Sequence, residues 1–140
     1  MSAEIARRDA PTFDDRSRER LTDVAQLALD EARRQGASGA DAGASVSQGL
    51  AVTVRMGEVE TLEHTRDKGL SITVYFGHRT GSASTTDLTP AAVRDTVRAA
   101  CAIARYTAED PCAGLPDAER LARQFPDLAL VHPWQPSVDQ

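Results

Sequence analysis

The residues best suited to acid–base or metal chemistry are the three histidines, and their spacing is not that of a protease metal site. A zinc protease helix carries two histidines one turn apart, as in His-Glu-x-x-His. His64, His78 and His132 instead stand far apart, in an expected strand, an expected turn and a proline-rich stretch. Glu63 and Asp67 lie close to His64 in the sequence, but exposed polar residues of a strand account for them. The sequence therefore predicts no metal site in this chain.

A run of small hydroxyl side chains at 81–86 is the next candidate for chemistry. Nucleophilic catalysis would need a histidine and an orienting carboxylate held beside a serine or cysteine. The run has no Gly-x-Ser-x-Gly elbow, and small hydroxyls are common in edge strands. The overlapping segment 77–82 lacks the lysine and the spacing of a P-loop, and a hairpin turn explains its glycines. We expect no catalytic residue and no phosphate site here.

Four residues remain as candidates for contact with a peptide. Arg66 and Lys68 flank Asp67 and form a local charge cluster that could bind a peptide carboxylate. The alternative interpretation of this cluster is a solvated turn. Ser82 and Ser84 lie on the small, polar last strand expected from the pattern. We therefore predict peptide contacts at Arg66, Lys68, Ser82 and Ser84.

The composition excludes several classes of function. The chain has 140 residues, 41% of them hydrophobic, which suits one domain with a single core. A net charge of −5 and scattered basic residues give no field that attracts phosphates, so no nucleic acid partner is expected. No stretch approaches the roughly 20 apolar residues of a membrane helix, and the charged start does not resemble a signal peptide. We therefore expect a cytoplasmic protein without a membrane partner.

Two amphipathic helices are expected. The first begins at Ser17, a capping residue, and ends before Gly36, where a left-handed conformation is favoured. The second is capped by Thr89 and has Pro90 in its first turn. Each has an apolar stripe at three- and four-residue steps: Leu21, Val24, Ala25, Ala28 and Ala32 in the first, and Val93, Val97, Ala100, Cys101 and Ala104 in the second. Such stripes are typical of helices that cover a sheet.

Between these helices, side chains alternate with the period of two that is typical of strands. The expected strands are 42–47, 50–56, 59–66, 70–76 and 80–85. Turn signals stand at 57–58, 67–69 and 77–78, and poor alternation around Leu62 indicates a bulge. We therefore predict an α+β fold in which an antiparallel β-meander of four to five strands packs against two main helices.

The pattern divides the chain into three parts. Residues 1–16 have no periodicity and are expected to be a disordered tail, 17–125 form the α+β N-terminal domain, and 126–140 form a proline-rich exit. A short helix is expected near 118–124. The last residues, 137–140, have the S-x-x-Q form of a capping box, but a helix cannot consist of one turn. We therefore expect the start of a truncated following helix and a longer parent protein.

Several short sequence motifs follow one another along the chain between residues 57 and 117. They are GEVETLE at 57–63, RDKGLSITVY at 66–75, GSAST at 81–85, AIARYT at 102–107, EDP at 109–111 and AGLPD at 113–117. From about Leu21 onward, the strings and the order of elements resemble the first domain of the PmbA/TldE proteins in the TldD/PmbA family of metallopeptidases. The serine-rich string is more similar to the PmbA side of the family than to the TldD side.

The resemblance implies a longer polypeptide with a second domain after this one. In that family a TldD-like subunit carries the metal-binding helix, and its PmbA-like partner shares the fold without the ligands. The pair acts on unfolded or small peptides. The resemblance thus implies a non-catalytic scaffold and a wall of the peptide channel, no cofactor in this chain, and zinc in a TldD-like partner.

Two other classes of function stay open on the sequence. The chain could be a stand-alone protein-interaction or structural module unrelated to proteolysis, which a natural stop at Gln140 would favour. A small-molecule enzyme using the loop 77–84 would need a pocket with a perturbed acid or base, and no residue predicts one. For the peptidase interpretation, we expect a peptide to add as a strand at the edge 80–85.

Overall fold

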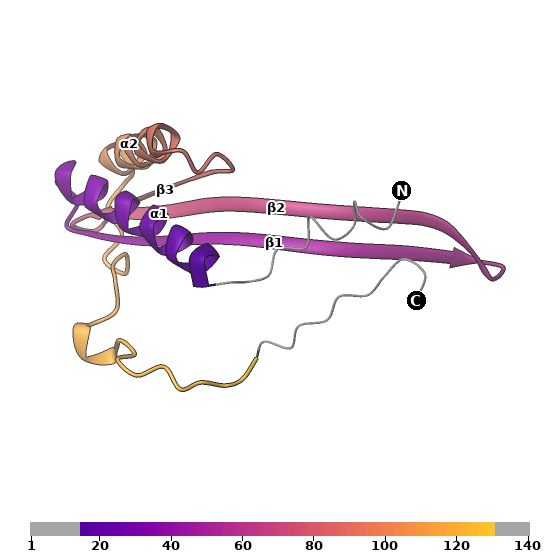
Figure 1. Ribbon diagram of the computed structural model, residues 1–140. Helices are drawn as coiled ribbons and strands as arrows, with labels where there is room; N and C mark the ends of the chain where they lie inside the picture. Colours follow the sequence, from indigo (N-terminus) through magenta and orange to yellow (C-terminus); the bar gives the residue numbers. More distant parts are fainter. Residues whose placement is uncertain (1–14, 131–140) are drawn as a thin grey trace.

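The computed structural model describes residues 15–130, which form two α-helices, three strands and one 3-10 turn (Figure 1). The helices are α1 (Asp15–Arg34) and α2 (Pro90–Tyr106), and the 3-10 turn η1 (Ala118–Arg120) follows them. The strands are β1 (Gly39–Arg55), β2 (Glu58–Phe76) and β3 (Arg79–Thr85). The α+β class expected from the sequence is confirmed.

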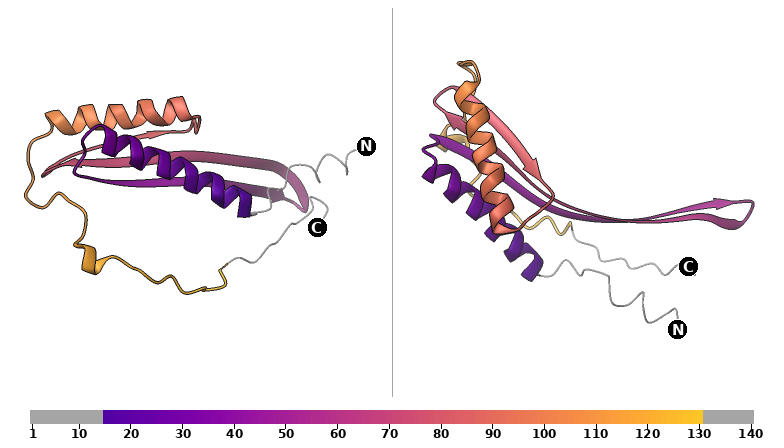
Figure 2. Two further views of the ribbon diagram at one scale, coloured as in Figure 1. Left: turned by 60° about the vertical axis from the view of Figure 1, so that its left-hand side comes forward. Right: turned by 90° about the horizontal axis from the view of Figure 1, so that it is seen from above.

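The strands form one antiparallel sheet in the order β1-β2-β3. β1 and β2 pair along their whole length, from Gly39 opposite Tyr75 outward, with a register shift between Thr53 and Val54. The seven residues of β3 pair only with the end of β2. The rest of the β1-β2 hairpin therefore extends beyond the helices as a two-stranded arm, visible in Figures 1 and 2. We call residues 46–69 the arm.

Both helices cover the same face of the sheet, and the core lies between them and the strands (Figure 2). On β2 every second side chain, Leu70, Ile72 and Val74, is buried, as the pleat of a strand requires. The buried apolar residues of the helices are Ala28, Ala32, Val93, Val97, Ala100, Cys101 and Ala104. The apolar stripe expected for the second helix is thus confirmed in every position.

A buried carboxylate joins the two helices. Glu31 of α1 is only 4% exposed. Its carboxylate oxygens lie 3.3 Å from a guanidinium nitrogen of Arg34 and 3.9 Å from one of Arg98 on α2, and Gln35 donates a hydrogen bond to it at 2.9 Å. Because a buried charge is stable only when it is paired, these contacts compensate the Glu31 carboxylate, and the one to Arg98 links α1 to α2.

Two of the three glycine turns expected between strands, at Gly57 and Gly77, are present. Gly57 and Gly77 have φ of 86° and 61° and stand in the two tight turns that connect β1 to β2 and β2 to β3. Gly36, with φ of 84°, follows α1. Glycine adopts this left-handed region without the steric penalty of a Cβ atom, so these positions end the elements where the pattern indicated.

The predicted turn at 67–69 is wrong, and with it the count of four to five strands. The chain stays extended there, with Asp67 opposite Ser47 and Gly69 opposite Ser45. The five expected segments therefore merge into three strands. Charged residues before a glycine are typical of a turn, but here the ladder to β1 satisfies the backbone and solvent satisfies the charges. The irregularity expected near Leu62 is confirmed as the register shift beside it.

The helix ends and the C-terminal segment also differ from expectation. Helix α1 already begins at Asp15, so the cap predicted at Ser17 is wrong and Ser17 lies inside the helix. The short helix predicted near 118–124 is only the single 3-10 turn η1. The tail before Asp15 and the capping box at 137–140 lie outside the described residues, and the division of the chain at 16/17 and 125/126 stays a prediction.

Candidate functional site

The face of the sheet opposite the helices carries a cluster of small hydroxyl groups, which we call the hydroxyl face. Its members alternate with the buried residues on the strands: Ser45, Ser71, Thr73, Ser82 and Ser84. The Oγ1 of Thr73 and the Oγ of Ser82 lie 2.9 Å apart across β2 and β3, and Ser71 Oγ donates to the Gly43 carbonyl at 3.4 Å. Because the side chains are short, this surface exposes backbone as well as hydroxyl groups.

An open depression lies at the edge of the hydroxyl face, where β3 ends. It has a volume of about 590 Å³ and is lined by Gly43, Ser45, Gly69, Leu70, Ser71, Ser84, Thr85 and Thr86. Small polar side chains with backbone donors and acceptors can hydrogen-bond an extended chain, but they offer no group for acid–base or nucleophilic chemistry. The depression thus presents hydrogen-bonding groups on an open surface.

Within residues 15–130, strand β3 is an edge of the sheet, because the order β1-β2-β3 leaves it with one neighbour there. Helix α2 lies directly over it: a Cβ atom added at Gly81 would lie 2.5 Å from the Ala104 nitrogen. The helix thus covers one face of β3, whereas Ser82 and Ser84 on the other face are exposed. An edge strand supported in this way presents ordered backbone groups that an added strand can use.

The four predicted peptide contacts fall into two pairs on opposite faces. Ser82 and Ser84 lie opposite Thr73 and Ser71, on the hydroxyl face. Arg66 and Lys68 alternate with Leu70 on β2, so they share the face that the helices cover, but on the arm beyond β3. The structure therefore brings the serines together and the basic residues together, but does not bring the two pairs to one face. Peptide contact at these residues stays a prediction.

The carboxylate of Asp87 stands between β3 and α2. It accepts a hydrogen bond from the Thr89 N–H at 2.9 Å. Hydrogen bonds from the backbone and side chain of Thr89, and more weakly the charge of Lys68, hold the pKa of Asp87 below its usual value of 3.8. Thr89 itself is the N-cap residue, as expected, but its side chain makes no cap hydrogen bond. Asp87 thus stabilises the start of α2.

The stabilising effect of Asp87 should disappear in acid. Because the pKa of Asp87 is lower in the folded than in the unfolded chain, its carboxylate adds stability above pH 3.8 that is lost as the pH falls through the folded pKa. We expect Asp87→Ala to have a slightly lower Tm than the wild type at neutral pH and the same Tm as the wild type in strong acid. Thermal melts of both proteins across this pH range, with Asp87→Asn as the isosteric control, would measure it. A difference that is the same at every pH would contradict the assignment.

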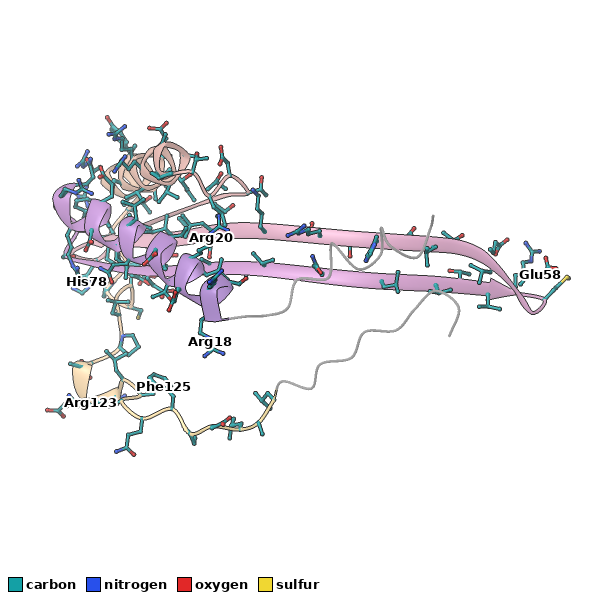
Figure 3. All side chains as sticks on the ribbon, in the orientation of Figure 1. Arg18, Arg20, Glu58, His78, Arg123 and Phe125 are labelled. Carbon is teal, nitrogen blue, oxygen red and sulfur yellow. The ribbon has the colours of Figure 1, made fainter. Side chains whose placement is uncertain are left out.

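The described residues do not form a metal centre. Within 15–130 no group of three or more His, Cys, Asp or Glu side chains could hold a metal ion. Figure 3 shows His78 at one end of the sheet and Glu58 at the other end, at the tip of the arm. The Nδ1 of His78 is 3.3 Å from the Ala113 carbonyl oxygen. His132 lies outside the described residues. Burial raises the pKa of the free Cys101 thiol, which makes it a poor nucleophile.

The sequence interpretation did not predict the arm, because it placed a turn at 67–69 and divided both long strands. The signal that could have found it is the tight turn at Gly57, since a strand that leaves such a turn must retrace the strand before it. The 17 residues of β1 and the 19 of β2 have nearly equal lengths on the two sides of that turn. No helix among residues 15–130 is long and apolar enough to cross a membrane.

Comparisons with known proteins agree with the resemblance found in the sequence. Residues 40–104 match the family described as PmbA/TldA metallopeptidase domain 1. The chain is 52% identical over 102 residues to metalloprotease PmbA of Escherichia coli O157:H7, covering 73% of this chain and 23% of that protein. It is 42% identical over 120 residues to a PmbA homolog of Haemophilus influenzae, covering 86% of this chain and 26% of that protein. The chain thus spans about a quarter of the length of these relatives.

Two solved structures share the fold. A candidate modulator of DNA gyrase from Bacteroides thetaiotaomicron superimposes with a TM-score of 0.70 at 24% identity, over 82% of this chain and 25% of that one. TldE from Thermococcus kodakarensis superimposes with a TM-score of 0.62 at 14% identity, over 79% of this chain and 25% of that one. These likenesses extend the agreement from sequence to fold. The chain therefore belongs, through residues 40–104, to the first domains of the PmbA/TldD metallopeptidase family.

Proposed function

We propose that this chain is the N-terminal domain of a PmbA-type subunit in a bacterial, cytoplasmic metalloprotease, and that it acts there as a non-catalytic scaffold. Its relatives of known name are metalloprotease PmbA and its homologs, from bacteria. The observation that carries the scaffold role is the hydroxyl face beside the free edge of β3, which offers hydrogen-bonding groups without a catalytic set. On this proposal the domain binds and orients unfolded or small peptides.

The zinc of such an enzyme would belong to a TldD-like partner subunit. A protein zinc site takes three or four His, Cys or carboxylate ligands. No three such side chains of residues 15–130 lie close enough together to bind a zinc ion, so the described residues do not fit this metal. No catalytic step is therefore assigned to a residue of this chain. Its contribution would be to form one wall of the peptide channel in the heterodimer.

We propose that a peptide adds to β3 as an extended strand. An added strand gains affinity from main-chain hydrogen bonds and specificity from the pockets that receive alternate side chains. The short side chains of Ser82 and Ser84 leave room for varied residues, which suits a subunit that accepts unfolded peptides of differing sequence. The depression at the end of β3, with a volume of about 590 Å³, could receive one larger side chain.

The proposed function is tested on the complex. The full-length subunit, obtained by extending the reading frame past Gln140, would be purified with a TldD-like subunit and assayed for cleavage of unfolded peptides. We expect activity only when both subunits are present, and loss of that activity with a zinc chelator. A full-length subunit that binds no TldD-like protein, or a complex whose cleavage ignores the chelator, would overturn the proposal.

Binding of a peptide to β3 should slow hydrogen exchange at the backbone amides of residues 80–85. Amides on the outer edge of a strand exchange rapidly until the carbonyl oxygens of a partner strand accept hydrogen bonds from them. We expect protection to rise at 80–85 on addition of an unfolded peptide and to stay constant at residues 48–54 of β1, which serve as the internal control. Hydrogen-exchange mass spectrometry on the same complex, with its active site emptied of zinc to prevent cleavage, would measure both segments. Unchanged exchange at 80–85 would eliminate strand addition there.

A protein-interaction module unrelated to proteolysis is the second candidate function. It is favoured by the arm, whose apolar side chains are half exposed although they lie in regular strands. Association of the protein with a partner, without any chelator-sensitive peptide cleavage by that complex, would support this candidate over the first.

A further inference from the structure

After α2 the chain crosses the end of the sheet that lies away from the arm tip. Figure 1 shows this passage from α2 past the strand ends toward η1. The passage contacts the first residue of β3 through Glu109, and the turn between β2 and β3 through Asp110 and Ala113. Further on, Leu115 lies against the start of β1. We call residues 107–115 the clasp, because they connect the ends of all three strands.

The turn at residues 77–78 is the point where the clasp is bonded to the sheet. The Asp110 N–H donates a hydrogen bond to the His78 carbonyl oxygen at 3.0 Å. The His78 Nδ1 lies 3.3 Å from the Ala113 carbonyl oxygen, which accepts a hydrogen bond when this nitrogen carries a proton. From the other side, the Oγ of Ser38 accepts a hydrogen bond from the Gly77 N–H at 2.9 Å. The turn is thus bonded both to the clasp and to the residue before β1.

Two arginines connect the start of β3 to the ends of both helices. A guanidinium nitrogen of Arg79 donates to the Arg105 carbonyl oxygen at 3.2 Å, in the last turn of α2. Arg105 in turn donates to the Gln35 carbonyl oxygen, just after α1, at 3.1 Å, and its guanidinium carbon lies 5.2 Å from the centre of the Phe76 ring. Carbonyl groups at a helix C-terminus have no partner within the helix. A displacement of Arg79 would therefore reach the ends of both helices.

The contacts that hold the clasp differ in strength. The Arg79–Glu109 ion pair has an N–O distance of 3.4 Å and side chains that are 43% and 68% exposed, and such a pair contributes little to stability. Leu115 is 48% exposed, and its Cδ1 lies 3.2 Å from the position of a Cβ atom added to Gly39, so it packs against the β1 backbone. The clasp is therefore held chiefly by the hydrogen bonds at His78 and the apolar contact of Leu115.

We propose that the clasp is a coupling device, which makes the order of β3 and of the last turn of α2 depend on the path of the chain that leaves the domain. With the clasp in place, His78 is fixed, and the next residue, Arg79, is positioned to bond the end of α2. When the chain beyond Leu115 is drawn away, the turn loses its bonds to Asp110 and Ala113.

Strand β3 is the element most sensitive to such a loss. It has only seven residues, and within residues 15–130 it pairs with β2 alone. A loose turn before its first residue therefore permits local opening from that end, without opening of the long β1-β2 ladder. Coupling of this kind travels through bonded and packed groups, which the turn and the two arginines supply here. The inference goes beyond the proposed function, since it requires neither a peptide nor a partner subunit.

The test uses the full 140-residue chain and two matched pairs of variants. Leu115→Ala weakens the clasp at β1, and its control Leu121→Ala removes the same side chain, 51% exposed, beyond the clasp. His78→Ala weakens the clasp at the turn, and its control His64→Ala removes a histidine from the arm. We expect amides of 79–85 and 103–106 to exchange about tenfold faster in both clasp variants, and to change by less than about twofold in both controls.

Hydrogen-exchange mass spectrometry distinguishes coupling from its alternatives. Amides of residues 93–97, in the first half of α2, serve as the internal reference and should exchange at the wild-type rate in all four variants. Faster exchange confined to 107–115 would overturn the proposal, because the clasp would then be a passive exit segment. Equal acceleration at 93–97 would also overturn it, because the variants would then lower the stability of the whole domain instead of loosening one end.

Discussion

Gly81→Ala should lower the free energy of unfolding by about 3 kcal/mol, the upper part of the range for overpacked sites. Gly81 lies where β3 passes beneath α2, and an added Cβ atom would overlap the carbonyl oxygen of Ala100 and lie 2.5 Å from the nitrogen of Ala104. These atoms belong to the helix backbone, so no side-chain rotation can relieve the overlap. The helix would have to move away from the sheet and give up contacts in the core.

The matched control for this change is Gly69→Ala, on β2. There the nearest atom to an added Cβ is the Thr85 carbonyl oxygen at 3.6 Å, an ordinary van der Waals contact. Urea unfolding of both variants, followed by circular dichroism, would give the two free energies. We expect the control to change stability by less than about 1 kcal/mol. Equal stability of the two variants would show that α2 does not lie as close to β3 as described.

Leu70→Ala should destabilise the domain by about 2 to 5 kcal/mol. Leu70 is 1% exposed and packs in the core where β2 enters the body of the domain. Removing its side chain forfeits the burial of the lost carbons and leaves a cavity between the sheet and the helices.

Leu62→Ala offers the same substitution on the same strand and the same face, but in the arm, where Leu62 is 45% exposed. With little burial to lose, its expected cost is below about 1 kcal/mol. The difference between the two variants in a single set of urea titrations would measure where the core ends along β2. Similar losses at Leu62 and Leu70 would mean that the arm is covered as fully as the core.

The helix α2 shows what the sequence can establish alone. Its first residue, Pro90, and its buried stripe were predicted correctly, because both depend on spacing within one helix. Family membership was equally accessible, since it follows from short strings in order. The strand that carries the small hydroxyl side chains, β3, also lies where the alternation indicated, whereas peptide contact at its serines stays a prediction.

The strands show what the sequence could not establish. Local signals at 67–69 favour a turn, yet the ladder to β1 keeps these residues extended, with Lys68 opposite Val46. The outcome depends on pairing between residues about 20 apart in the chain, which no local pattern contains. For the same reason the sequence could not show that Arg66 and Ser82 lie on opposite faces: the face of each residue depends on unbroken alternation through the position where a turn was expected.

The arm has a mechanical property that a loop of equal length would lack. Its two strands are continuous with two of the three strands of the body, and the β1-β2 register is uniform from Gly39 to Thr53. No register shift interrupts the pairing over this length, so the direction in which the arm leaves the body follows the twist of the sheet. A partner bound along the arm would therefore be oriented by the same ladder that orders the hydroxyl face.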